Sequence, residues 1–222
     1  MNEPILDEIQ QRMAKFAASN TPEREAAGRK EHEDRERRAH NMQVSEKRVD
    51  WNAPKRHVTC TPELSGPWGE QFLKLKSMLD PSKGRLIALV GGRGNGKTQM
   101  AVEAMKVRTS LLKSARFASA VEFFIRIKAT YRKDSDSDEM EVLAEFQKPS
   151  LLVIDEIGKR GGSEWENTML FELLNRRYND MKDTILIDNR SSAEFVETIG
   201  PSLASRMNEG GGIMDCQWES FR

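Results

Sequence analysis

The chain is poor in cysteine and in long apolar runs, and each shortage excludes a class of protein. Cys60 and Cys216 are its 2 cysteines, and two residues so far apart make no disulfide framework. No apolar run approaches the roughly 20 residues that a helix needs to cross a bilayer. The opening MNEPILDEIQ lacks the basic and then apolar pattern of a signal peptide. We therefore expect a reduced, cytoplasmic protein with no membrane partner.

Net charge is absent as well, because 35 Lys and Arg residues balance 35 Asp and Glu residues. The balance holds within residues 1–60 and within the remainder, so neither part is a polybasic arm or an acidic tail. Any nucleic-acid site must then be a local patch. Charged residues still make up 32% of the chain, above the roughly 25% of ordinary domains. This excess favours one domain with a charged appendage.

The first 50 residues carry that appendage. Apolar side chains at helical spacing over residues 4–18 predict an amphipathic helix, which either docks in a partner's groove or folds back on residues 42–49. Thr21 and Pro22 have the pattern of an N-cap and a first helical position. The stretch from there to Arg38 has no large apolar side chain, which is typical of a solvated helix or a partly disordered spacer. We assign residues 1–50 to a helical, charged region, 51–66 to a linker and 67–222 to a compact domain.

Apolar runs of strand length alternate with helical patterns in that domain. Strands are predicted near residues 86–90, 116–120, 151–154, 184–188 and 213–218, and helices over 68–79, 100–112, 121–132 and 164–181. The acidic run at 134–139 is assigned to a solvated loop. His57 and Cys60 have the spacing of half a zinc site, but no second pair follows, so we assign them to the linker. The alternation predicts an α/β fold with a five-stranded, mostly parallel sheet.

The stretch GGRGNGKT matches G-x-x-x-x-G-K-[ST] without a gap. A loop of this kind turns backbone N–H groups toward phosphate oxygens, while Lys97 reaches the outer phosphates and the Thr98 hydroxyl binds Mg²⁺. The strand before the loop and the helix after it supply the context that the motif requires. The sequence therefore predicts a site for ATP or ADP with Mg²⁺, formed by Gly91, Gly92, Arg93, Gly94, Asn95, Gly96, Lys97 and Thr98.

Two acids end the apolar run LLVIDE, at the edge of the sheet where ligands of open α/β folds bind. In P-loop ATPases an Asp at this point holds Mg²⁺ through water, and a neighbouring Glu polarises the attacking water. Beside a complete P-loop we favour these roles for Asp155 and Glu156 over two acids that simply end a strand. A P-loop kinase of small molecules is a further alternative, but the arginine-rich lid that it needs is not evident.

Four later segments carry a resemblance to a known family. In order and spacing, LLVIDEIG, TILIDN, SLASRM and QWESFR resemble the DnaC and IstB branch of AAA+ ATPases, and specifically the DnaC-like helicase loaders of bacteria and phages. The resemblance covers residues 84–222. It implies a P-loop AAA+ ATPase core that lacks the C-terminal lid, with slow ATP hydrolysis.

The same resemblance implies a function. A protein of this kind is an ATP-dependent loader that places the replicative hexameric DNA helicase on single-stranded DNA in replication initiation. It holds the helicase through its N-terminal region and self-associates through its AAA+ domains. An IstB-type helper ATPase that assembles on DNA for a transposase is the alternative within the same branch.

Two further site residues are implied by the resemblance alone. Asn189, at the end of TILIDN, matches the polar sensor of the γ-phosphate, and the alternative is an Asn that turns a strand into a loop capped by Ser191 and Glu194. Arg206, in SLASRM, matches the arginine finger that a neighbouring subunit inserts in trans. The alternative for Arg206 is a solvated helical arginine.

The family's contacts to single-stranded DNA match Lys128, Tyr131, Ser163 and Trp165. Tyr131 also fits the apolar stripe of its helix, so a core tyrosine is an equal interpretation. Trp165 is predicted to project opposite the apolar stripe of its own helix and to form an exposed stacking platform. Ser163 also fits an N-cap in a capping box that Glu166 closes.

Overall fold

The computed structural model describes residues 11–12, 22–48, 51–79, 83–132, 134 and 137–221. The chain divides into two compact units, residues 1–45 and residues 46–222. The helix predicted over residues 4–18 lies outside the described residues, except for residues 11–12, which are helical. None of the helices in the described part of the chain has the length and hydropathy that a membrane span needs.

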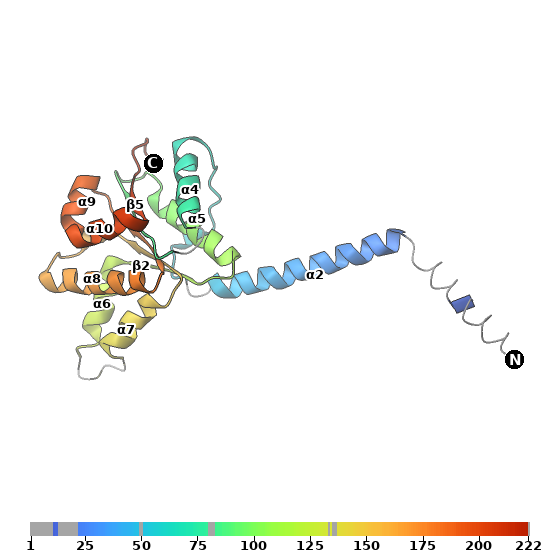
Figure 1. Cartoon of the computed structure of the whole chain (residues 1–222), viewed down its shortest axis with the longest axis horizontal. Helices are drawn as coiled ribbons and strands as arrows, with labels where there is room; N and C mark the ends of the chain where they lie inside the picture. The colour runs from blue at the N-terminus through green and yellow to red at the C-terminus, as the bar shows by residue number, and fades with distance from the viewer. Residues whose placement is uncertain are drawn as a thin grey trace. The chain divides into compact units, whose positions relative to one another are not determined.

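The first unit contains most of helix α2, which runs from Pro22 to Arg48 (Figure 1). Its sequence has strong helix formers and begins with proline at the first helical position, where the missing N–H costs nothing. Exposed ion pairs one turn apart, such as Asp34 with Arg37 at 2.8 Å, add a few tenths of a kcal/mol each, on the order of 0.3–0.5. The charged stretch is therefore a solvated helix and not the partly disordered spacer that was the alternative.

The second unit is an α/β domain built on one sheet. Its strands are β1 (Leu86–Val90), β2 (Ala115–Ser119), β3 (Leu151–Asp155), β4 (Asp183–Ile187) and β5 (Gly212–Asp215). Its helices are α3 (Lys55–Val58), α4 (Gly66–Met78), α5 (Lys97–Ser110), α6 (Ala120–Ala129), α7 (Glu139–Gln147), the short 3₁₀ helix η1 (Ile157–Lys159), α8 (Glu164–Asn179), α9 (Ser192–Ile199) and α10 (Pro201–Gly210). The strand order is β2-β3-β4-β1-β5 and every pairing is parallel, which confirms the five-stranded sheet.

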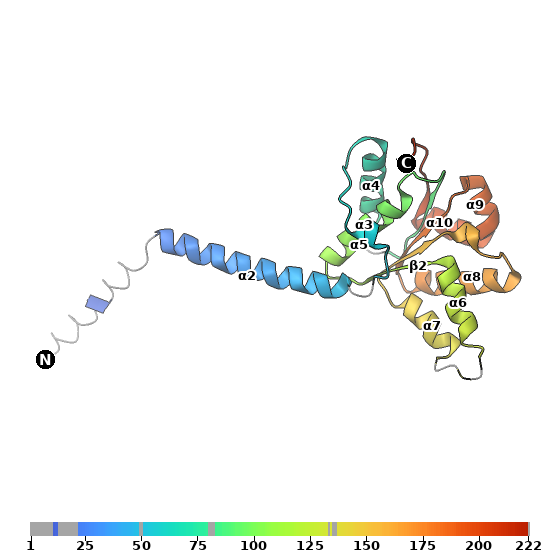
Figure 2. The same cartoon turned by 180° about the vertical axis from the view of Figure 1, so that it is seen from behind.

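Helices cover both faces of this sheet, as Figures 1 and 2 show. Alternate side chains of β1 enter two separate cores. Leu86, Ala88 and Val90 pack with α6, α7, α8, α9 and α10, whereas Ile87 and Leu89 pack with α4 and α5. Because both faces are buried, the strands have continuous apolar runs rather than alternating ones. The carboxyl ends of β1, β3 and β4 then meet at one edge of the sheet.

Helix α7 was not expected from the sequence, which assigned its acidic N-terminal end to a loop. Asp138 caps the helix by accepting a hydrogen bond from the Glu141 backbone N–H at 2.7 Å, and the Glu141 side chain closes the capping box. Val142, Leu143 and Phe146 are buried against the sheet. The last acids of the run therefore start a packed helix.

Residues 51–66, assigned to a linker, pack on the α/β domain. Trp51 is 2% exposed in the core beneath α4 and α5, and its carbonyl accepts a hydrogen bond from the Phe117 N–H at 2.6 Å. Helix α3 contacts α5, and the Lys106 ammonium donates to the Cys60 carbonyl at 2.6 Å. This segment is part of the compact domain.

Candidate nucleotide site

The P-loop joins β1 to α5, and its backbone adopts positive φ angles that favour glycine. Gly91 and Gly96 have φ of 125° and 73°. A Cβ on Gly91 would lie 2.6 Å from the Cys216 carbonyl oxygen, and one on Gly96 would lie 2.7 Å from the indole nitrogen of Trp68. Gly96 is the N-cap of α5, so the positive end of the helix dipole points at the loop. A side chain at either position would therefore collide with Cys216 or Trp68.

Lys97 and Thr98 are held at the start of α5. The Lys97 ammonium donates to the carbonyls of Gly91 and Gly92 at 2.7 and 2.6 Å, and burial lowers its pKa. The Thr98 hydroxyl donates to Asp155 Oδ2 at 2.9 Å, which joins the P-loop to the end of β3. Burial raises the pKa of Asp155, while the hydrogen bond from Thr98 opposes that shift. A hydroxyl and a carboxylate this close form an oxygen donor set that fits Mg²⁺.

Glu156 has a backbone conformation that is costly for a residue with a side chain. Its φ is 61°, in the left-handed region, and strain of this kind costs about 1–3 kcal/mol and is concentrated at functional sites. Its N–H donates to Asp155 Oδ1 at 2.6 Å, and its carboxylate contacts the Lys159 ammonium. The turn points the two neighbouring carboxylates in different directions, and both line the same pocket.

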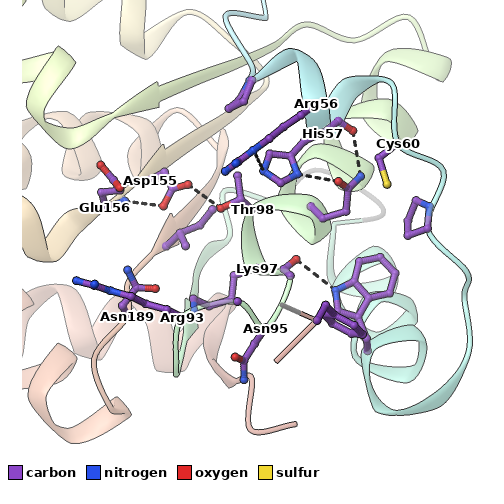
Figure 3. A pocket seen from close by; sticks show the side chains of 18 of the residues that line it. Arg56, His57, Cys60, Arg93, Asn95, Lys97, Thr98, Asp155, Glu156 and Asn189 are labelled. Atoms are coloured by element: carbon purple, nitrogen blue, oxygen red, sulfur yellow. Dashed lines mark hydrogen bonds between the residues drawn. The ribbon is translucent and has the colours of Figure 1, made fainter. Parts of the chain in front are cut away.

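That pocket has a volume of about 1020 Å³ (Figure 3). Asp155 and Glu156 lie on one side of it, His57 and Cys60 on the other, and Thr98 between them. This volume is at the upper end of the roughly 300–1,000 Å³ of small-molecule pockets, so the pocket is larger than a phosphate group alone needs.

Several residues of this pocket were missed by the sequence analysis. His57, assigned to the linker, pairs through Nδ1 with the Gln99 side chain at 2.8 Å, and Gln99 donates back to the His57 carbonyl at 3.0 Å. Arg56, Trp68 and Phe221 also line the pocket. Phe221 belongs to the segment QWESFR, to which no ligand role was assigned, and the other positions come from α3 and α4, where no motif marks them. Among the described residues no group of three His, Cys, Asp or Glu side chains is placed to hold a metal ion.

Asn189 follows β4 and is in the pocket with the P-loop and the two acids. The capping box expected next to it is present, since Ser191 and Glu194 cap α9 reciprocally. Both interpretations of this Asn are therefore compatible with its position.

Arg206 lies elsewhere, on α10. Its guanidinium donates to Asn175 Oδ1 at 2.8 Å and to Ser202 Oγ at 3.0 Å, and it lies 5.4 Å from the centroid of the Phe171 ring. It is not among the residues that line the pocket of its own chain. The structure brings together Lys97, Thr98, Asp155, Glu156 and Asn189, but not Arg206.

The four predicted DNA contacts lie at or just beyond the C-terminal end of α6 and at the N-terminal end of α8, and three of them contact one another. The Trp165 indole N–H donates to the Tyr131 hydroxyl at 3.3 Å, and the two rings meet edge to face at 6.1 Å. The Lys128 ammonium lies 5.1 Å from the centroid of the Trp165 ring. Ser163 is the N-cap of α8 and accepts a hydrogen bond from the Glu166 N–H. We call Lys128, Tyr131 and Trp165 the aromatic cluster.

The surroundings of these residues exclude one alternative and differ from two expectations. Of the two interpretations of Tyr131, a core tyrosine is excluded, because the residue is 57% exposed: α6 ends at Ala129 and its periodicity stops there. Trp165 is half-buried, because its ring packs on Phe124 of α6 at 5.9 Å. Glu166 does not close a capping box, since its carboxylate pairs with Lys128 at 3.5 Å.

Comparisons with known proteins agree with this geometry. A family model described as IstB-like ATP binding protein matches residues 23–208. The replicative helicase loader DnaC of Escherichia coli strain K12 is 24% identical over 152 residues, which are 67% of this chain and 62% of that protein. The matched part of the chain thus spans less than two thirds of the length of this curated relative.

Solved structures share the fold. The DnaC helicase loader superposes with a TM-score of 0.59 at 22% identity, covering 74% of this chain and 97% of that one. DnaI superposes with a TM-score of 0.60 at 14% identity, covering 78% and 96%. The α/β domain of this chain thus has the fold of these two structures. The family model matches well over half of the residues of this chain, so the chain belongs to the family of IstB-like ATP-binding proteins.

Proposed function

We propose that this protein is an ATP-dependent loader that places a replicative DNA helicase on single-stranded DNA. The observation that carries the proposal is the 152-residue alignment with a protein named as a replicative helicase loader. Two features of the ATPase domain support it: a nucleotide pocket with paired carboxylates, and an aromatic cluster with a cation on its surface. An ATPase that moves a ring onto single-stranded DNA needs both.

The pocket residues have distinct roles in this proposal. The P-loop amides and Lys97 bind the phosphates, for which Lys97 must give up its contacts to Gly91 and Gly92. Thr98 and Asp155 would hold Mg²⁺, which neutralises phosphate charge when it is bound. Glu156 orients a water molecule and accepts its proton, and Asn189 contacts the γ-phosphate.

Arg206 acts on the site of a neighbouring subunit in this proposal, since it lies outside the pocket of its own chain. Arg206→Ala should leave ATP affinity nearly intact and remove the hydrolysis that assembly stimulates. Mixing it with Glu156→Gln tests the arrangement, because the Glu156→Gln subunit still offers a working Arg206. Phosphate release should recover in the mixture. Arg176→Ala, on the exposed Glu172 pair of α8, is the control, and a mixture as inactive as either variant alone contradicts a site shared between subunits.

The aromatic cluster is proposed to stack on a base of single-stranded DNA. Trp165→Ala should weaken binding of a labelled oligothymidine by about 1–3 kcal/mol, measured by fluorescence anisotropy, and leave ATP affinity unchanged. Trp165→Phe keeps a ring and should keep most of the affinity. The ring also packs on Phe124, so melting temperatures must be compared. Unchanged DNA affinity in a folded Trp165→Ala protein would remove this role.

A second candidate, a helper ATPase for a transposase, is favoured by the description of the matched family model. The two functions differ in the partner. Full-length protein should co-elute with the replicative helicase of its host and not with an IS21-type transposase. Co-elution with the transposase alone would favour the helper ATPase.

A further inference from the structure

Residues 216–221, here called the tail segment, lie on the P-loop. The Cys216 N–H donates to the Val90 carbonyl at 2.8 Å, where β1 ends. The Trp218 indole N–H donates to the Asn95 carbonyl at 2.9 Å, and the Phe221 N–H donates to the Gly94 carbonyl at 3.1 Å. The middle of the P-loop is therefore attached to a segment more than 120 residues further along the chain.

Asn95 completes this attachment from the loop side. Its side-chain amide donates to the carbonyls of Cys216 and Trp218 at 2.8 and 2.7 Å, so both of its donors go to the tail segment. Asn95 is buried, and the P-loop motif places no constraint on this position. The tail segment and the loop are thus joined by hydrogen bonds donated from both sides.

Phe221 is the exposed end of the tail segment. Its ring is 67% exposed although its N–H is fixed on Gly94, and it lines the pocket. A Cβ on Gly96 would lie 3.3 Å from Phe221 Cε2 and 2.7 Å from the Trp68 indole nitrogen, so the two rings flank the N-cap of α5. Trp68 is buried and stacked on Phe72, whereas Phe221 has an open face.

An open aromatic face beside a phosphate cradle fits one part of a nucleotide. Phosphates need the amides and cations of the loop, whereas the base is planar and apolar on its faces and stacks on aromatic rings. The pocket that the P-loop lines also has apolar and aromatic side chains, among them Pro54, His57, Pro62 and Phe221.

We propose that the tail segment is the base-binding wall of the nucleotide site: Phe221 stacks on the nucleobase, and the Asn95–Trp218 hydrogen bonds position the wall on the P-loop. The inference rests on the proposed nucleotide binding and gives Phe221 a role that neither the P-loop motif nor the resemblance assigns to it. The phosphate and base halves of the site are then one rigid unit.

The test compares two probes on the full-length protein, Mg²⁺-ATP and Mg²⁺-tripolyphosphate, the second having phosphates and no base. Phe221→Ala should raise the Kd of ATP about 5- to 100-fold by calorimetry and change the Kd of tripolyphosphate less than about twofold. Phe221→Tyr should restore ATP binding. Trp218→Phe, which keeps the ring but lacks the indole N–H, should weaken both probes because it loosens the loop.

The outcomes separate this inference from the proposed function. One outcome overturns the base-binding wall alone: ATP binds to the wild-type protein and to Phe221→Ala with the same affinity, and does not bind to Lys97→Ala. Equal weakening of both probes by Phe221→Ala overturns stacking and leaves only a role in loop geometry. Wild-type protein that binds neither probe overturns the nucleotide site and this inference with it.

Discussion

Glu156→Gln will keep ATP bound and slow its hydrolysis by about 100- to 10,000-fold, the usual contribution of a general base. The amide keeps the size of the side chain but cannot accept the proton of the attacking water. Lys97→Ala should instead abolish nucleotide binding, because it removes the ammonium from the phosphate cradle. Calorimetry with ATP and phosphate release under saturating ATP separate the two effects.

Glu197→Gln is the matched control for this pair, since Glu197 is exposed on α9 and outside the pocket. It should bind and hydrolyse ATP like the wild type. A Glu156→Gln protein that hydrolyses ATP at the normal rate would show that the base is another group. The strained backbone of Glu156 would then need a different explanation.

Asp183→Ala should lower the free energy of unfolding by about 3–5 kcal/mol, because it leaves a buried cation without its carboxylate. Asp183 is fully buried at the start of β4 and pairs with Arg108 at 2.5 Å. It also accepts the Arg85 and Lys83 backbone N–H groups at 2.8 and 3.3 Å. The carboxylate therefore joins β4, α5 and the residues that lead into β1.

Urea unfolding followed by circular dichroism measures this loss. Glu172→Ala removes the exposed pair with Arg176 one turn away on α8 and should cost less than about 1 kcal/mol. A cost for Asp183→Ala as small as that of Glu172→Ala would contradict the structural role given to the buried pair.

The P-loop and the two acids could be predicted because their chemistry is local in the sequence. The strands on both sides of the loop are continuous apolar runs, and such runs indicate buried parallel strands without further information. The carboxyl ends of parallel strands lie at one edge of the sheet, which brings Thr98 and Asp155 together, whereas the order of the strands was not predicted. A short motif and a strand pattern were therefore enough to predict the positions of the P-loop and the two acids.

Contacts between distant segments could not be predicted in the same way. Asn95 and Trp218 are far apart in the sequence, and a hydrogen bond between them leaves no periodic pattern. The core interpretation of Tyr131, one of its two alternatives, depends on extending the period of α6 past the helix end at Ala129, and the sequence does not mark that end. Trp165 was expected to be an exposed platform opposite the apolar stripe of α8, but its ring packs on Phe124 and against the same core as that stripe, so it is half-buried.

The helicase-binding region remains a prediction. The amphipathic pattern over residues 4–18 lies outside the described residues, apart from residues 11–12, so its docking role rests on the sequence alone. We expect this pattern, and not the charged helix α2, to bind the helicase, because α2 has no apolar stripe for a groove.

Loading of a hexameric replicative helicase on closed circular single-stranded DNA tests the central claim most directly. The circle has no free end, so the DNA can enter the helicase only if the helicase ring is opened. Helicase retained on the circle after gel filtration is measured with ATP, with and without this protein. We predict that wild-type protein increases the retained helicase and that Lys97→Ala does not. Equal retention with wild-type protein, with Lys97→Ala and with no added protein would contradict the claim.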